Sequence, residues 1–330
     1  MGSIFNSPFS FISVIIPMRN EAKFIEKCVK SVLDQNYSKS RFEIIIIDGM
    51  STDSSKKIVA NLVKKNSNIR LFDNPGMTTP AGLNIGIKNA KGEVITRVDA
   101  HSYIASDYLQ KIVNSFNNEQ IMAVGGPVRK ISSSFLSETI NLALSSPFGI
   151  GGGLHWYSKE RRFVDTVFRA SYRKEIFDIV GYFDETMIYA EDEELNWRIR
   201  KAGYKIVLSP EIKCYYYPRS SIGGLFKQYY DYGSARVKVI RKHPDFFRIK
   251  HIIPSAFILS LIGNGILAVF NVWFLWLFLG VAGSYLIISL AFSALISQKK
   301  GWRYFGLLPI SFACLHFGYG IGFLCRLFTK

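Results

Sequence analysis

Short apolar runs alternate with amphipathic stretches over roughly the first third of the 330-residue chain. Four runs rich in β-branched residues predict strands at 12–16, 44–47, 69–72 and 94–98. Periodic stretches between and after them predict helices at 21–33, around 58–63, from about Pro80, and at 108–116. Pro17 is expected to end the first strand. Because the second run is apolar on both faces, it indicates a central strand of a mostly parallel α/β sheet.

The middle of the chain, 125–217, has a mixed pattern. A glycine-rich stretch at 149–153 predicts a flexible loop, and the clearest helix is expected at 191–201. His155 and Trp156 follow the glycines and suggest a mobile loop facing an acceptor, since a Trp offers a flat surface to a sugar ring. A plain surface loop explains the same residues.

The C-terminal part of the chain is strongly apolar. Residues 252–298 carry no charged side chain, which is enough for two membrane crossings of about 20 residues each, with a turn near Asn271. A further apolar run covers 304–328. If that run also crosses, Arg326 and Lys330 lie on the far side, against the positive-inside tendency. A re-entrant or interfacial third segment therefore stays open.

Charge adds a reason to place this tail at a membrane. The formal net charge is +16, and no acidic residue follows Asp245. Six basic residues crowd the approach to the apolar tail: Arg236, Lys238, Arg241, Lys242, Arg248 and Lys250. Since the excess charge lies beside apolar segments, membrane lipids are expected as a partner and nucleic acid is not. The stretch 222–242 is expected as a helix in the membrane interface, although an ordinary surface helix has the same composition.

These patterns divide the chain into three parts. We expect an α/β domain at 1–220, a basic amphipathic segment at 221–250 and a membrane domain at 251–330, with two or three transmembrane helices.

Three acidic residues fall where ligands collect, at the carboxyl ends of parallel strands or at a helix start. Asp48 ends the second strand, Asp99 follows the fourth, and Asp192 begins the helix at 191–201. Each has a structural explanation as a turn former or as an acid at the start of a helix. Asp99 and His101 form an Asp-x-His sequence, which suits a divalent cation.

The combination and order of these residues resemble family 2 glycosyltransferases of the GT-A fold. The resemblance covers about the first 210 residues and is carried by 14–21 (VIIPMRNE), 48–53 (DGMSTD), 82–87 (GLNIGI), 99–101 (DAH) and 191–192 (ED). Within the family, the chain is most similar to membrane-anchored enzymes of the succinoglycan type, which build bacterial exopolysaccharide on a lipid carrier.

The resemblance implies a role for each matching position. Pro17, Glu21 and Asp48 match residues around the nucleotide base and ribose of the donor. Asp99 matches the first acid of the DxD motif, which holds Mg²⁺ or Mn²⁺ against the donor diphosphate. Asp192 matches the general base that takes the proton of the acceptor hydroxyl, so that one displacement inverts the anomeric carbon.

The chain departs from the family pattern at three places. Ile47 replaces the first acid of a common Asp-Asp pair, and His101 replaces the second acid of DxD. The metal is then held by Asp99 with His101 or by Asp99 alone, with His101 shaping the turn. The Gln-x-x-Arg-Trp motif of processive members is absent from 228–232, which favours addition of a single sugar.

The resulting hypothesis is an inverting glycosyltransferase at the cytoplasmic face of a bacterial or archaeal plasma membrane. It transfers a hexose from a nucleoside-diphosphate sugar, with UDP the favoured nucleotide, to a polyprenyl-linked saccharide, with a multi-pass membrane domain as anchor. A processive polysaccharide synthase and a non-catalytic membrane scaffold that binds a nucleotide sugar are the alternatives.

Overall fold

The computed structural model describes residues 11–132, 134–151, 159–216 and 221–329. The chain divides into two compact units. Unit 1 consists of Met1–Lys130 and Leu154–Tyr217, and unit 2 of Ile131–Gly153 and Pro218–Lys330. Unit 2 thus includes 131–153, which the sequence pattern places in the first domain, because this segment packs against the C-terminal helices.

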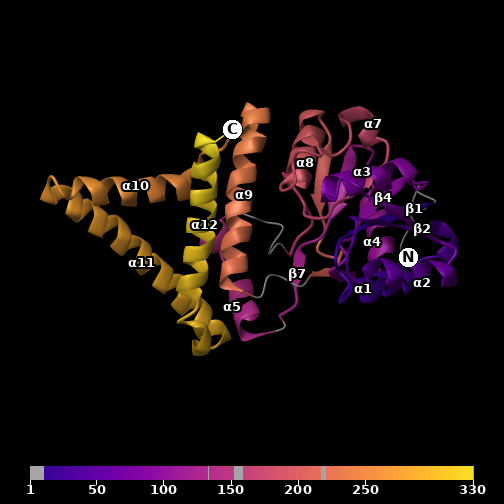
Figure 1. The fold of residues 1–330 in the computed structure, drawn as a ribbon, viewed down its shortest axis with the longest axis horizontal. Coiled ribbons are helices and arrows are strands. Elements are labelled where there is room, and N and C mark those ends of the chain that lie inside the picture. The colour runs from indigo at the N-terminus through magenta and orange to yellow at the C-terminus, as the bar shows by residue number, and fades with distance from the viewer. Residues whose placement is uncertain (1–10, 133, 152–158, 217–220, 330) are drawn as a thin grey trace. The chain divides into compact units, whose positions relative to one another are not determined.

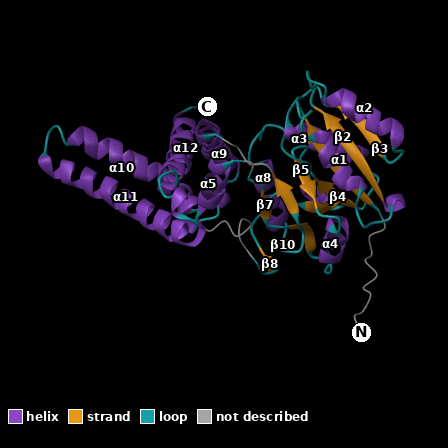
Figure 2. Cartoon of the chain, turned by 90° about the horizontal axis from the view of Figure 1, so that it is seen from below, coloured by secondary structure: helices purple, strands orange, loops and turns teal. Residues whose placement is uncertain are grey.

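Unit 1 is built on an eight-stranded mixed sheet (Figures 1 and 2). Its strands, in spatial order, are β3 (Ile69–Asp73), β2 (Phe42–Asp48), β1 (Ile12–Met18), β4 (Val94–Arg97), β9 (Ser171–Arg173), β6 (Ile121–Gly125), β10 (Lys205–Leu208) and β8 (Arg162–Phe163). The first four are mutually parallel, whereas β9 runs antiparallel to both of its neighbours. A second sheet has the order β5 (Ser102–Ile104), β11 (Cys214–Tyr216) and β7 (Val128–Lys130). The expected α/β class is confirmed.

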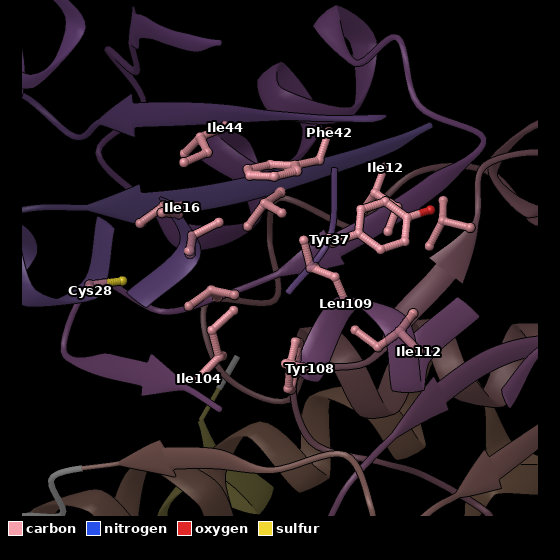
Figure 3. Packing of buried hydrophobic residues seen from close by; sticks show 14 of the residues in the cluster. Ile12, Ile16, Cys28, Tyr37, Phe42, Ile44, Ile104, Tyr108, Leu109 and Ile112 are labelled. Atoms are coloured by element: carbon pink, nitrogen blue, oxygen red, sulfur yellow. The ribbon is translucent and has the colours of Figure 1, made fainter. Parts of the chain in front are cut away.

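Helices cover both faces of the large sheet. They are α1 (Ile25–Leu33), α2 (Ser55–Lys65), α3 (Thr79–Asn89), α4 (Tyr108–Ser115), α7 (Ile176–Val180) and α8 (Glu191–Lys201), with a 3₁₀ turn η1 (Lys39–Arg41). Alternate residues of β1 enter different cores: Val14 and Ile16 pack with residues of α1 and α4, and Ile15 packs with residues of α3 and α8. Figure 3 shows the first of these cores. Burial on both faces explains why β2 consists of apolar residues almost throughout.

Pro17 does not end β1, contrary to the expectation. The strand continues to Met18, and Pro17 lies in register with Ile47 of β2. On the other side, β4 pairs with β1 only as far as Ile15. Pro17 therefore occupies a stretch with one strand neighbour, where the missing N–H is tolerated.

Unit 2 is helical. Its elements are α5 (Phe135–Leu144), α6 (Pro147–Ile150), α9 (Ile222–Lys242), η3 (Pro244–Phe246), η4 (Ile249–His251), α10 (Ile253–Leu267), α11 (Val272–Lys300), η5 (Trp302–Tyr304) and α12 (Leu308–Phe328). Residues of α5, α9, η5 and α12 share one apolar core. The loop expected at 149–153 is found only in part, because Gly149 and Ile150 belong to α6, and Gly151, with a φ of 63°, follows the end of this helix. His155 and Trp156 lie outside the described residues.

Two helices in the described part of the chain are long and apolar enough to cross a membrane. They are α11 and α12, with mean hydropathies of 2.0 and 1.5. The shorter α10 has 15 residues and reaches α11 through the expected turn near Asn271. These apolar helices indicate association with a membrane.

Candidate active site

The loops that leave β1 and β2 at the carboxyl edge of the sheet are tied together by hydrogen bonds. The Asn20 N–H donates to Ser51 Oγ over 3.0 Å, and the Thr52 N–H donates to Asn20 Oδ1 over 2.8 Å. One step further, the Glu21 N–H donates to Ser55 Oγ over 2.8 Å. These reciprocal bonds fix the backbone on which Glu21 and Asp48 stand.

Backbone strain is concentrated at the same edge. Five non-glycine residues in the described part of the chain have a positive φ, between 54° and 63°: Asn20, Met50, Met77, Arg169 and Ala190. The first three follow β1, β2 and β3, Arg169 precedes β9, and Ala190 precedes α8. Each such residue costs about 1–3 kcal/mol, and residues of this kind cluster at functional sites.

The Asp99 carboxylate is held by two buried arginines. Arg97 Nε lies 2.8 Å from Asp99 Oδ1, and Arg169 Nε lies 2.7 Å from Asp99 Oδ2. The three residues are 3–8% exposed. Burial opposes ionisation of Asp99, but Arg169 and then Arg97 outweigh it, so that its pKa lies well below the usual range. Asp99 is therefore a fixed anion.

Arg97 also reaches the start of α8. Its Nη1 lies 2.7 Å from Glu191 Oε1, and the exposed fraction of either side chain is at most 10%. One guanidinium thus joins the end of β4 to the residue before Asp192, across 94 positions of sequence. We call Asp99, Arg97, Arg169 and Glu191 the buried ion network.

Arg169 contacts two aromatic rings and a hydroxyl group in addition to Asp99. Its guanidinium lies 4.5 Å from the ring centroids of both Phe168 and Tyr216, and its Nη1 donates to Ser102 Oγ over 2.5 Å. Aromatic faces stabilise a desolvated cation in this geometry. Arg169 therefore holds Asp99 from within the protein rather than from solvent.

Asp192 lies in the first turn of α8 and is 9% exposed. Its Oδ1 accepts a hydrogen bond from the Glu193 N–H over 2.9 Å. Burial, followed by the charge of Glu191, raises the pKa of Asp192 to about 8, although Arg97 acts in the opposite direction. A carboxyl group with a pKa near the working pH can take up a proton, which a general base requires.

The loop that leads toward α8 is positioned by a buried asparagine of α3. Asn84 Nδ2 donates to the Phe183 carbonyl over 2.9 Å, and the Phe183 N–H donates to Asn84 Oδ1 over 3.0 Å. Asn84 belongs to the GLNIGI segment of the family resemblance. Its contacts explain why a polar residue occupies a buried helix face.

The remaining predicted site residues have different surroundings. Glu21 Oε1 lies 3.0 Å from His101 Nδ1, so the structure brings these two residues together. Asp48 is fully buried, and its carboxylate accepts from the Ser51 N–H over 3.2 Å. Asp48 therefore shapes the turn after β2 in this structure. Pro17 lies near the end of β1, beside this turn.

A divalent cation would find a small donor set here. Asp99 offers a carboxylate and His101 an imidazole, while the described residues contain no cluster of three His, Cys, Asp or Glu side chains that could hold a metal. Mg²⁺ is commonly held by one or two carboxylates together with substrate phosphates and water. Since each carboxylate oxygen has two lone pairs, Asp99 can keep both arginines and still bind an ion. These residues fit a cation site that a diphosphate completes.

The interpretation of the sequence missed Arg97 and Arg169, and it included Glu191 in the family resemblance without a role in the site. Arg97 had a visible signal, because it is a charged residue in a strand whose every residue is buried. Arg169 had none, because its pairing with Asp99 arises only when β9 joins the sheet beside β4.

The buried ion network should contribute strongly to stability. We expect Arg97→Gln to lower the free energy of unfolding by about 3–5 kcal/mol, because the buried carboxylates of Asp99 and Glu191 lose a shared partner. Urea unfolding of the detergent-purified protein measures this change. The control is Lys56→Gln, which removes an exposed pair with Asp73 and should leave unfolding unchanged. Equal unfolding of Arg97→Gln and wild type would contradict the expectation.

Comparisons with known proteins agree with this geometry. The family described as "Glycosyl transferase family 2" matches residues 13–180. A relative from Methanococcus voltae, dolichyl N-acetyl-alpha-D-glucosaminyl phosphate 3-beta-D-2,3-diacetamido-2,3-dideoxy-beta-D-glucuronosyltransferase, is 35% identical over 269 residues, covering 78% of this chain and 83% of its own. The succinoglycan biosynthesis protein ExoA of Rhizobium meliloti is 26% identical over 312 residues, covering 94% and 93%.

A solved structure has a similar fold. It is the mannosyltransferase PcManGT from Pyrobaculum calidifontis in complex with GDP-Man and Mn²⁺, which aligns with a TM-score of 0.61 at 17% identity over 98% of this chain and 92% of that chain. The expected GT-A fold and the resemblance to the succinoglycan type are confirmed. This chain belongs to glycosyl transferase family 2 and is a glycosyltransferase.

Proposed function

We propose that this glycosyltransferase moves a hexose from a nucleoside-diphosphate sugar, with UDP as the nucleotide, to a polyprenyl-linked saccharide. The observation that carries the proposal is the ion network, in which Arg97 bonds both Asp99 and the residue before Asp192. The network brings Asp99, which is suited to bind the donor, and Asp192, which is suited to act on the acceptor, to one edge of the sheet. The Methanococcus voltae relative, named for a dolichyl-linked substrate, supports the lipid-linked acceptor.

In this mechanism, Asp192 removes the proton of the acceptor hydroxyl. The hydroxyl oxygen forms a bond to the anomeric carbon while the bond from that carbon to the diphosphate oxygen breaks. The proton stays on Asp192, and the electron pair leaves with the nucleoside diphosphate. Attack opposite to the leaving group inverts the anomeric configuration.

On the donor side, Pro17 and Glu21 would border the base and ribose. Asp48 would act indirectly on the base and ribose, because it is buried and holds the turn after β2 through the Ser51 N–H. Asp99 and His101 would hold Mg²⁺ or Mn²⁺, which neutralises the negative charge that develops on the leaving diphosphate. Arg97 and Arg169 keep Asp99 ionised and oriented.

The setting of the reaction follows from the chain as a whole. We place the catalytic domain, expected at 1–220, on the cytoplasmic face without the segment 131–153, which belongs to unit 2. An interfacial segment at 221–250 and a multi-pass membrane domain at 251–330 follow it. In α9, 228–232 is QYYDY and lacks the Arg and Trp of the processive motif, which favours one sugar per acceptor and a role in polysaccharide biosynthesis.

The decisive test uses a panel of UDP-, GDP- and dTDP-sugars with a polyprenyl-linked acceptor. We expect one donor to be used, and Asp192→Asn to lower turnover by about 10²–10⁴-fold with an unchanged donor Kd, because general base catalysis is lost. Nucleotide release and calorimetry give the two values. Asp178→Asn, at an exposed position of α7, is the matched control and should behave as wild type. Near-normal turnover of Asp192→Asn would end the assignment of the base.

The pH dependence of transfer should reflect the raised pKa of Asp192. Below a pH of about 8 the free enzyme holds Asp192 protonated, so kcat/KM should rise with pH and level off above that value. Glu191→Gln should move this limb to lower pH, because the charge of Glu191 raises the pKa of Asp192. A kcat/KM that stays flat between about pH 6 and about pH 9 would argue against Asp192 as the titrating base.

Removal of divalent metal should stop transfer. We expect chelation to abolish turnover, and added Mn²⁺ or Mg²⁺ to restore it, because the leaving diphosphate needs its charge neutralised. His101→Ala distinguishes the two interpretations of that residue: a ligand would raise the Mn²⁺ concentration needed for half-maximal donor binding in calorimetry, and a turn-shaping residue would not. Full activity after chelation would contradict the metal site.

A further inference from the structure

Helices α9 and α12 lie side by side and parallel along their length (Figures 1 and 2). Each has 21 residues. At one end, Leu225 shares a core with Leu308 and Phe312. At the other end, Arg241 donates hydrogen bonds of 3.0 Å to the carbonyls of Leu327 and Thr329. The two helices therefore share one direction.

Glycines bring the two backbones into contact. A Cβ added to Gly233 of α9 would overlap the Tyr319 carbonyl, and one added to Gly322 of α12 would overlap the Tyr230 carbonyl. Such close packing holds two helices as one body. Whatever angle α9 makes with a bilayer, α12 must make nearly the same angle.

The charges of α9 are incompatible with a membrane crossing. Lys227, Asp231, Arg236 and Lys238 are spread along its length, and Lys227 pairs with Asp231 over 3.2 Å. Each charged residue near the centre of a crossing helix costs about 2.5–3.5 kcal/mol on insertion scales. The hydropathy of α12 alone is that of a membrane-crossing helix. Its neighbour α9, however, carries charged residues, so the pair is not surrounded by apolar side chains as a crossing helix is.

The middle of α12 is also covered by a segment that a bilayer would not admit. His316 Nε2 lies 2.8 Å from the carbonyl oxygen of Phe148 in α6, and the Phe148 ring contacts Phe312. Helix α6 has only four residues, and short helices with open ends do not face lipid. Half of the most apolar window of α12 is buried within the protein, against 6% of that of α11.

The hairpin of α10 and α11 is different. Its turn carries Phe270, 81% exposed, and Trp273, 72% exposed. Basic residues lie at both of its ends, with Lys250 before α10 and Lys299 and Lys300 at the end of α11. In Figures 1 and 2 the hairpin projects away from the α9–α12 pair. An exposed apolar hairpin with basic flanks fits a bilayer that has anionic headgroups.

We infer that α12 does not cross the membrane: α9 and α12 lie together in the membrane interface, and the α10–α11 hairpin alone enters the hydrocarbon. This arrangement leaves Arg326 on the same side as Lys299 and Lys300, as the positive-inside rule favours. The inference concerns membrane attachment and stands independently of the proposed reaction.

Cysteine labelling in intact cells tests the arrangement. The background carries alanine at Cys214, Cys314 and Cys325 and keeps Cys28, which is fully buried. Lys300→Cys marks the end of α11, Thr329→Cys marks the end of α12, and Lys64→Cys, on an exposed position of α2, marks the cytoplasmic side. A membrane-impermeant maleimide is applied to intact and to permeabilised cells.

We expect all three cysteines to be labelled only after permeabilisation. Labelling of Thr329→Cys in intact cells, with Lys300→Cys protected, would mean that α12 crosses and would overturn the inference. Labelling of Lys300→Cys alone in intact cells would mean that α11 and α12 both cross, which overturns it equally. Labelling of Lys64→Cys in permeabilised cells confirms that the reagent reaches the cytoplasmic side.

Discussion

The pairing of Arg97 with two buried carboxylates is the interaction on which the site depends. Desolvating these charges is expensive, and only close geometry with further hydrogen bonds offsets the penalty. The end of β4, the strand β9 and the start of α8 must therefore meet in one arrangement. Arg169 and Arg97 hold the pKa of Asp99 below its usual range, whereas burial and then the charge of Glu191 raise the pKa of Asp192.

Patterns that depend on near neighbours in the chain could be predicted from the sequence. The strands at β1 to β4 follow from β-branched runs, and Asp48, Asp99 and Asp192 stand at the strand and helix ends expected for them. Long-range pairing could not be predicted in the same way. Arg169 meets Asp99 because β9 enters the sheet beside β4, and no local pattern encodes that neighbour.

The membrane helices show the same limit. Hydropathy along the chain describes α12 as though lipid surrounded it, whereas in the folded unit α9, α5 and α6 surround much of it. A hydropathy scale records nothing of the close packing that the glycines of α12 allow. They matter here because they admit the backbone of α9, which carries the charges.

The bridging position of Arg97 has a consequence for redesign of this edge of the sheet. A substitution beside Asp99 alters the field at the start of α8, and a substitution there alters the field at Asp99, because both act through one guanidinium. Effects of paired substitutions across this bridge are therefore non-additive. A change at either end of the Arg97 bridge is therefore expected to require a compensating change at the other end.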